Sequence, residues 1–255
     1  MAAPHLYRTE AVVLKRTDVG ETDKILTLYT PHLGKIRAVA KGVRRPTSRL
    51  GGHVELFVHS HMLVAKARNL DIVTQSETIN PFLALRDDLW RTTNAYYVAE
   101  LLDQMTPDHL ENLAVFELLL ATLQRLAEDR NPELAVRFFE MQLMDLLGYR
   151  PELRNCVRCR TLLDARDSYF SATAGGVLCP DCGRNDPTSL NLPLPAFKML
   201  RLLQGGDYAL AKRVRLEEPL RRDLEVVLRG YSQFILEHEL KSARVLNSLR
   251  GGGAG

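Results

Sequence analysis

The sequence of 255 residues contains 45% hydrophobic and 25% charged residues, which is the composition of an ordinary soluble protein and excludes a disordered or fibrous chain. No stretch approaches the roughly 18 apolar residues of a membrane span, and the first residues, MAAPHLYRTE, do not form a secretory signal. We therefore expect a cytoplasmic protein that does not associate with a membrane.

The net charge of +3 is unevenly distributed along the chain. Residues 1–80 carry a net charge of +5, residues 81–150 carry −6 and residues 151–255 carry +4. Charge that is segregated in this way can orient a protein on a polyanion even when the total is small. We expect the acidic segment 81–150 to repel such a ligand and to leave its surface for protein partners.

The first 80 residues predict a small β-barrel. Runs rich in β-branched residues, separated by Gly, Pro, Asp or Asn, cover residues 10–16, 24–30, 35–41, 53–66 and 70–79. Five short strands before any helix favour an OB-fold barrel, although a small SH3-like barrel or an open sheet would show the same pattern.

Helices follow the strands. From about residue 82 the apolar period changes from two residues to nearly four, which predicts two helices before residue 130. A third has Asn131 as its N-cap, Pro132 at its first position and Gly148 just past its end. Helical spacing returns at 195–203 and at about 217–240. The fold class is therefore α+β.

The domains that we expect are an OB-fold at 1–80 and a helical domain built from residues 81–150 plus 188–250. The segment 151–187 is then an insert in the helical domain. The tail GGGAG, residues 251–255, has nothing to bury, and we expect it to be disordered.

All four cysteines lie in the insert. They form two pairs, Cys156 with Cys159 and Cys179 with Cys182, in the pattern C-x₂-C-x₁₉-C-x₂-C. Each C-x₂-C turn can bring two thiolates to one ion, and two such turns complete a tetrahedron. The pattern favours one structural Zn²⁺ ion, which would supply folding free energy that so small an insert cannot obtain from a core.

Other interpretations of the cysteines stay open. Two disulfides or a redox dithiol are the alternatives, as are ligands that no longer bind metal, but a cytosolic location disfavours disulfides. His53 and Glu55, followed by a later C-x₂-C, superficially match a zinc deaminase signature. That match fails because no proline precedes either cysteine pair and because His53 falls in a predicted strand. Motifs for nucleotide binding or serine hydrolysis are absent from the sequence.

The strongest positive charge lies in one loop, AKGVRRPTSRLGG, residues 40–52. The strand before it alternates, which places Lys35, Arg37 and Lys41 on the solvent-facing side. Arginine suits phosphate because its planar fork donates two hydrogen bonds at once. Few aromatic residues accompany these cations, so we expect sequence-tolerant binding to a nucleic-acid backbone. A solvated basic surface without a ligand is the alternative.

Residues 11–52, AVVLKRTDVGETDKILTLYTPHLGKIRAVAKGVRRPTSRLGG, closely resemble the N-terminal domain of the bacterial RecO family. The family's hallmarks are a GETD turn, an HGK-like turn and an AKGARRPKSR-like loop. The resemblance continues through NPF, YYVAELLD, the paired cysteine motifs, LNLP and SARVL, so it covers nearly the whole chain. The sequence departs from the pattern at HLGK and at the threonine of RRPTSR, which removes one cation.

The resemblance implies an OB-fold, a helical domain and a zinc finger in a recombination mediator of the RecF pathway. Members of the family bind single- and double-stranded DNA and anneal complementary strands. They contact the single-strand binding protein SSB and the partner RecR, and they help RecA to load onto SSB-coated DNA. The resemblance implies no catalysis, places the protein at the nucleoid, and assigns zinc to Cys156, Cys159, Cys179 and Cys182.

The DNA contacts that we expect all lie in the barrel segment. They are Lys35, Arg37, Lys41, Arg44, Arg45 and Arg49, with Lys15, Arg16 and Lys24 as weaker candidates. Three rival functions remain on the sequence alone: a zinc-ribbon protein that binds another protein, an RNA-binding OB protein, and an enzyme. Only the last is disfavoured by the missing motifs.

Overall fold

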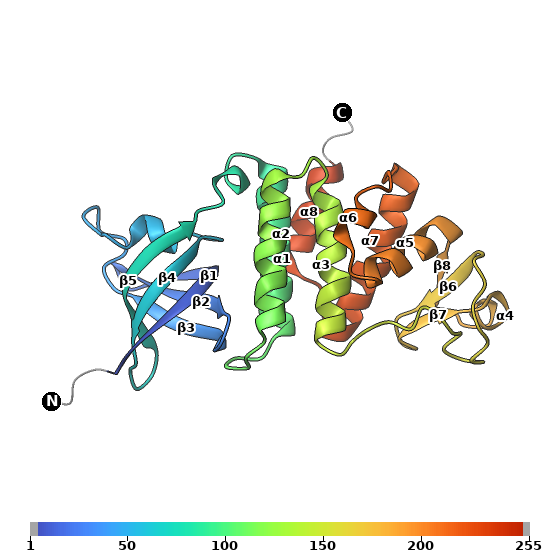
Figure 1. Ribbon diagram of the computed structural model, residues 1–255, viewed down its shortest axis with the longest axis horizontal. Coiled ribbons are helices and arrows are strands. Elements are labelled where there is room, and N and C mark those ends of the chain that lie inside the picture. Colours follow the sequence, from blue (N-terminus) through green and yellow to red (C-terminus); the bar gives the residue numbers. More distant parts are fainter. Residues whose placement is uncertain (1–4, 252–255) are drawn as a thin grey trace. The chain divides into compact units, whose positions relative to one another are not determined.

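The computed structural model describes residues 5–251 and divides into two compact units. Unit 1 contains the described residues up to Arg130 together with the last segment from Lys241, and unit 2 contains Asn131–Leu240. The helical residues 81–150 plus 188–250 are therefore distributed over both units. The α+β class is confirmed (Figure 1). Within the described part of the chain, no helix has the length and apolar character that crossing a membrane requires.

Five strands of unit 1 close into a barrel. They are β1 (Leu6–Val19), β2 (Asp23–Thr30), β3 (Gly34–Ala40), β4 (His59–Ala65) and β5 (Asp71–Asn80). Their order around the barrel is β1-β2-β3-β5-β4, and only the β3–β5 pair is parallel. This is the predicted OB-type barrel. β1 is long because its first half pairs with β4 and its second half with β2.

The barrel interior follows the alternation of the sequence. Ala11 and Val13 of β1, Leu26 and Leu28 of β2, and Ile36 of β3 point inward and are almost completely buried. Residues between them face outward, as a two-residue period requires. Val12, Leu14 and Thr27 face away from the barrel interior but are buried as well, because the helices α1 (Leu89–Met105) and α2 (Leu113–Glu128) pack against β1 and β2.

The prediction of one strand over residues 53–66 is wrong in its first half. Residues Gly51–Val54 form the 3₁₀ turn η1, and β4 begins only at His59. Phe57 lies between them with φ of 66°, a left-handed conformation that no strand accommodates. His53 accordingly lies in a 3₁₀ turn and not in a strand.

Three helices complete unit 1: α1 (Leu89–Met105), α2 (Leu113–Glu128) and α8 (Lys241–Gly251), preceded by the 3₁₀ turn η2 (Leu83–Leu85). The side chains of Asp88 and Asn112 cap α1 and α2 by accepting from backbone N–H groups in the first turn. The guanidinium group of Arg91 donates to the carbonyl oxygens of Leu126 and Asp129, which ties the start of α1 to the end of α2.

The loop between α1 and α2 packs directly on the barrel. Gly34, with φ of +60°, lies so close to Leu110 that an added Cβ would come within 2.0 Å of its carbonyl oxygen. His109 N–H donates to the carbonyl oxygen of Lys35 over 2.9 Å. The glycine of the HLGK turn is thus required both by its backbone conformation and by this close approach.

Unit 2 combines helices with a small sheet. Its helices are α3 (Pro132–Leu146), α4 (Pro180–Arg184), α5 (Leu194–Gln204), α6 (Tyr208–Ala211) and α7 (Glu218–Leu236), and its strands are β6 (Ser168–Ser171), β7 (Gly176–Leu178) and β8 (Leu190–Leu192). α3 packs against α5 and α7. Pro132 does begin α3 after Asn131, as predicted, and Gly148 follows its end.

The three-stranded sheet, α6 and α8 were not predicted by the sequence pattern. Each strand of the sheet has only three or four residues, which is too short for a visible two-residue period. Of the tail 251–255 that we expected to be disordered, Gly251 ends α8 and residues 252–255 lie outside the described residues.

We predict that Glu100→Gln loosens the attachment of α8 to α1. The Glu100 carboxylate accepts hydrogen bonds from the N–H groups of Lys241 and Ser242 at the start of α8, over 3.1 and 2.8 Å. Burial alone would raise the pKa of Glu100, but these bonds and the Ser242 hydroxyl lower it below its usual value. Removal of such a cap costs about 0.5–2 kcal/mol. Hydrogen exchange should accelerate in residues 241–249 of the variant.

The same carboxylate predicts a pH dependence. Because the folded-state pKa of Glu100 is lowered, its stabilising effect is present above the pKa of the unfolded chain and is lost as the pH falls through the folded-state pKa. The protection factors of the α8 amides, which correct for the pH dependence of intrinsic exchange, should therefore fall on acidification more steeply in the wild type than in Glu100→Gln. Equal pH profiles for the two proteins would contradict this assignment.

Candidate metal centre and nucleic-acid interface

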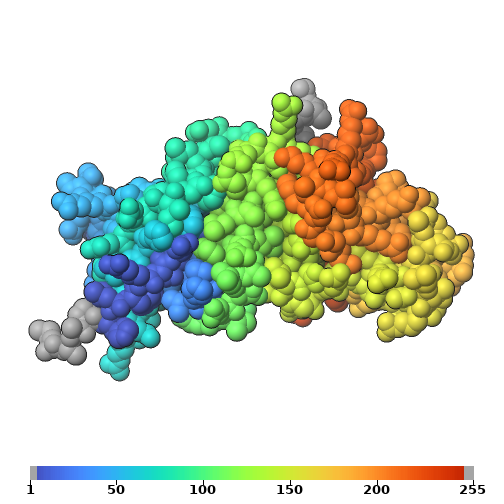
Figure 2. Space-filling model, in the orientation of Figure 1, coloured from blue at the N-terminus to red at the C-terminus, as the bar shows by residue number. Residues whose placement is uncertain are grey.

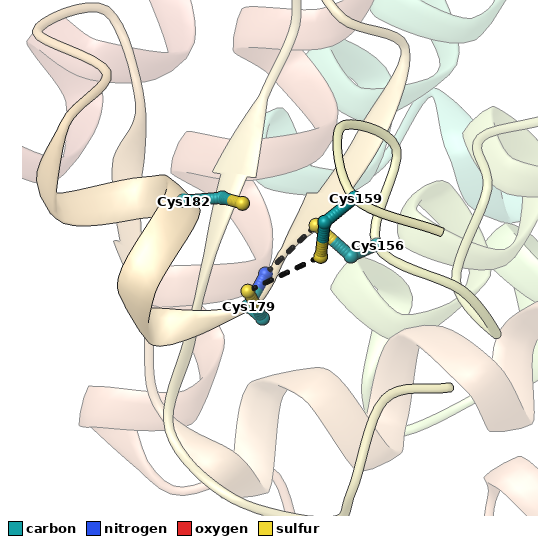
Figure 3. A group of neighbouring side chains, drawn as sticks. All are labelled: Cys156, Cys159, Cys179 and Cys182. Atoms are coloured by element: carbon teal, nitrogen blue, oxygen red, sulfur yellow. Dashed lines mark hydrogen bonds between the residues drawn. The ribbon is translucent and has the colours of Figure 1, made fainter. Parts of the chain in front are cut away.

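The four cysteines meet at one point in unit 2. Cys156 and Cys159 lie on a turn before β6, Cys179 follows β7, and Cys182 lies in α4. Figure 3 shows the four side chains converging from these three segments. Their Sγ atoms all lie within 4.8 Å of one another, and no other such cluster of potential ligands occurs among the described residues.

The geometry fits a tetrahedral thiolate site. A metal–sulfur distance of about 2.3 Å places the sulfurs of a regular tetrahedron about 3.8 Å apart. The Sγ atoms of Cys159 and Cys179 are 3.8 Å apart. Four thiolates leave no open coordination position, so a metal held here is structural and not catalytic.

Local backbone structure holds both cysteine turns in place. The carboxylate of Glu152 accepts from the N–H groups of Arg154 and Asn155 just before Cys156. In the second turn Gly183 packs against the ring of Tyr169, where an added Cβ would come within 2.3 Å of ring atoms. A glycine one residue after Cys182 therefore lets α4 approach the sheet.

The thiols differ in their electrostatic environment. Cys159 is exposed, and hydrogen bonds with the Thr161 side chain and backbone lower its pKa to about 6. Burial raises the pKa of Cys182 to about 12, with the neighbouring thiols acting in the same direction. Backbone N–H groups help to lower the pKa of Cys156 although burial opposes them. The Cys159 thiol therefore ionises more readily than that of Cys182.

The cationic loop follows β3 in unit 1, and residues 41–50 are defined here as the basic loop. Lys41, Arg44, Arg45 and Arg49 are all exposed in it. Figure 2 shows this light-blue segment projecting from the barrel surface. Arg44 makes one long ion pair with Asp18, at 3.6 Å, with 41% of its side chain exposed. The arginine heads are thus presented to solvent.

Asp23 anchors the basic loop. Its carboxylate accepts from the N–H of Gly42 over 2.7 Å and from the hydroxyl of Thr22 over 2.9 Å. These bonds, the first of them foremost, hold the pKa of Asp23 below its usual value. Arg44 N–H donates to the carbonyl oxygen of Thr22, and the Val43 side chain beside it is buried. The GETD motif does not by itself predict this role of Asp23, because the partner Gly42 lies 19 residues later in the chain.

Two further predicted cations lie on the outer face of the barrel beside this loop. Lys15 of β1 pairs with Thr27 of β2, and Thr27 pairs with Arg37 of β3. Cross-strand partners share a face, so Lys15 and Arg37 lie two strands apart, about 10 Å, on the same side. Both side chains are exposed.

Besides Arg44, three of the predicted cations are held in ion pairs, all of them less exposed than Arg44. Arg16 pairs with Glu55, and Lys24 pairs with Asp18. Lys35 is buried, and its ammonium lies 3.1 Å from Asp103 and 3.4 Å from Asp108, with 10% of the side chain exposed. The expectation that Lys35 shares a solvent-facing side with Arg37 is therefore wrong, because the loop between α1 and α2 covers it.

Comparisons with known proteins identify the same family over nearly the whole chain. Residues 1–82 match the family described as Recombination protein O N terminal, and residues 86–244 match Recombination protein O C terminal. A protein of Roseiflexus sp. (strain RS-1), named DNA repair protein RecO, is 42% identical over 245 residues, which cover 96% of this chain and 86% of that protein. A protein of the same name in Dehalococcoides mccartyi is 40% identical over 249 residues, which cover 98% of either chain. Another, in Symbiobacterium thermophilum, is 36% identical over 248 residues, which cover 96% of this chain and 98% of that protein.

We predict that Asp23→Ala releases the basic loop without opening the barrel. The substitution leaves the N–H of Gly42 without its acceptor, so hydrogen exchange should rise in residues 41–50 while the β4 and β5 amides stay protected. Asp18→Ala is a matched control, because that carboxylate pairs with the side chains of Lys24 and Arg44. Equal exchange in the loop of both variants would contradict an anchoring role for Asp23.

We predict that the chain binds one metal ion per molecule and that Cys182→Ser does not retain it. Elemental analysis of the purified protein would count the ion. Removal of the metal should unfold the sheet β6–β8 while the barrel melts at its usual temperature, because unit 1 contains none of the ligands. A metal-free wild type with a protected β6–β8 sheet would contradict the prediction.

Proposed function

Because the chain belongs to the RecO family of DNA repair proteins, we propose that it acts as a recombination mediator that binds single- and double-stranded DNA through its barrel. In this proposal the protein anneals complementary strands. With RecR it helps to load RecA onto DNA that is coated with SSB. The site of action is the nucleoid, in the cytoplasm.

The single observation that supports DNA binding most strongly is the arrangement of six exposed cations on one part of the barrel. Four lie in the basic loop, and two lie on the adjoining strands. We propose that they contact backbone phosphates: Lys15, Arg37, Lys41, Arg44, Arg45 and Arg49. Arg16 and Lys24 would contribute only by exchanging their carboxylate partners for phosphate, and the burial of Lys35 removes it from the proposed contacts.

Annealing follows from the same charges. Two complementary strands repel each other through their phosphates, and cations that neutralise both strands on one surface lower that repulsion. Contacts to phosphate carry no sequence information, so the protein can act on any pair of complementary strands. Such a process breaks no covalent bond, and we propose that the protein is not an enzyme.

We propose that the metal of the cysteine site is Zn²⁺. Four thiolate ligands in a closed tetrahedral arrangement are typical of structural zinc. The ion would fold residues 151–187, whose regular elements are the short strands β6 and β7 and the single-turn helix α4. We keep these residues as the zinc-finger part of the domain division, with the barrel at 1–80 and the helices at 81–150 plus 188–250.

We predict that Arg44→Ala/Arg45→Ala/Arg49→Ala weakens DNA binding and flattens its salt dependence. For a single strand, each neutralised phosphate contributes about 0.7 to the slope of log K against log [salt], so removing three cations should change the slope by about 2. Fluorescence anisotropy with a labelled oligonucleotide over a range of salt concentrations measures both quantities. Arg86→Ala/Arg130→Ala removes two exposed cations outside the barrel and serves as the control. An unchanged slope in the triple variant would count against the basic loop.

Strand annealing tests the mediator role itself. Complementary oligonucleotides coated with SSB should anneal faster with the wild-type protein than without it, and the triple variant should show little of that acceleration. A protein that binds DNA but leaves the annealing rate unchanged would contradict the mediator function and leave DNA binding intact.

A further inference from the structure

A groove with a volume of about 590 Å³ opens at the end of the barrel opposite the basic loop. It lies between the first residues of β1, the β2–β3 turn and the loop between α1 and α2. Pairing of β1 with β2 begins only at Val12, so Leu6–Ala11 border the groove without a β2 partner. If the register continued, Glu10 would face Pro31, which has no N–H to donate. Pro31 therefore helps to explain why the first half of β1 does not pair with β2 and leaves the groove open.

The groove is separate from the basic loop. β3 leads from the β2–β3 turn at Gly34 to the basic loop after Ala40. Its seven residues span about 20 Å. In Figure 1 the turn between β4 and β5 and the turn between β2 and β3 lie at the lower end of the barrel, and the basic loop lies at its upper left. A ligand much shorter than this distance of about 20 Å cannot occupy both ends.

Charge in the groove favours an anionic ligand. Its two carboxylates are occupied within the fold: Asp71 accepts from the Tyr7 hydroxyl over 2.7 Å and from the Ala67 N–H over 3.1 Å. Glu10 lies 3.0 Å from the Nε2 atom of His59. The cations Arg8 and Lys66 are exposed, and neither makes an ion pair within the described residues. Glu10 keeps 41% of its side chain exposed and also lies 4.0 Å from the Nδ1 atom of His61, and His32 lies 3.1 Å from Glu111. Arg8 and Lys66 are therefore the charged groups of the groove that have no ion-pair partner among the described residues.

Flat rings line the same groove. Four of the seven histidines of the chain do so: His5, His32, His61 and His109, all of them exposed. His109 is held in the left-handed region at φ of 60° by the bond from its N–H to Lys35. Non-glycine residues are uncommon in that conformation, and such outliers cluster at functional sites. Imidazole rings can stack on unpaired bases, which a single strand exposes and a duplex hides.

We propose that this histidine-lined groove is a second binding site for single-stranded DNA, in which Arg8 and Lys66 contact phosphates and the His109 ring stacks on a base. The inference rests on the proposed DNA-binding function and adds a place where bases are held. An acidic peptide could pair with Arg8 and Lys66 but has no base to stack on the histidine rings. The rings therefore favour single-stranded DNA over an acidic peptide. A strand long enough to span both ends of the barrel would engage the groove and the basic loop together.

The phosphate contacts are tested with Arg8→Ala/Lys66→Ala. For a labelled oligo(dT) that spans the barrel, the slope of log K against log [salt] should be flatter than that of the wild type by about 1.4. Arg86→Ala/Arg130→Ala removes the same charge elsewhere in unit 1 and should bind like the wild type. Circular dichroism melting of each variant checks that the fold is retained.

Stacking is tested with His109→Asn, because asparagine tolerates the left-handed backbone but lacks the ring. The affinity for oligo(dT) should fall about fivefold or more. For an abasic oligonucleotide of the same length, the variant and the wild type should bind equally. An equal reduction on both oligonucleotides would show a structural effect and overturn the stacking assignment.

The outcomes of these experiments distinguish failure of the groove proposal from failure of the proposed DNA-binding function. If the groove variant behaves like its control while the triple variant of the basic loop binds weakly, the groove proposal is overturned and DNA binding stands. The groove proposal is also overturned if Arg8→Ala/Lys66→Ala weakens binding of an acidic peptide and not of DNA. If the wild type binds no oligonucleotide, both proposals are overturned.

Discussion

The hydrogen bond from the N–H of Gly42 to the carboxylate of Asp23 is the interaction on which the cationic surface depends. This bond acts together with the one from the Arg44 N–H to the Thr22 carbonyl oxygen and with the buried side chain of Val43. They hold the arginines of the basic loop in a segment that a phosphate strand does not have to order first. The Gly42 bond joins the start of β2 to the segment that leaves β3. It therefore places four cations beside Lys15 and Arg37, where they extend one charged surface.

Ion pairing decides which cations of the barrel remain for a ligand. Lys35, Arg37 and Lys41 follow the same two-residue alternation, yet Lys35 lies between the carboxylates of Asp103 and Asp108. Burial of a lysine requires such partners, and its charge then serves the attachment of the α1–α2 loop to the barrel. Arg37, which has no such cover, stays exposed. Asp103 and Asp108 of the acidic segment 81–150 thus neutralise Lys35, one of the cations that the sequence predicts for the DNA-binding surface.

Much of the barrel and the whole metal site could be predicted from the sequence, because both depend on local spacing. Alternating apolar residues define β1, β2 and β3, and the C-x₂-C pairs define the ligands. What could not be predicted depends on residues far apart in the chain. The cover over Lys35 comes from residues about 70 positions later, and Asp23 gains its role only when Gly42 folds back on it. The late start of the fourth strand depends on one left-handed residue, Phe57, for which the sequence gives no signal.

The discontinuity of unit 1 has a consequence for synthesis of the chain. Its last helix, α8, begins at Lys241, after all of unit 2 has been made. On the ribosome, α8 can therefore reach the Glu100 carboxylate only after roughly 140 more residues have been made, and the segment with the four cysteines can fold in that interval. A chain truncated before residue 241 would carry the complete barrel and the four-cysteine cluster, but the face of α1 that α8 covers would be exposed.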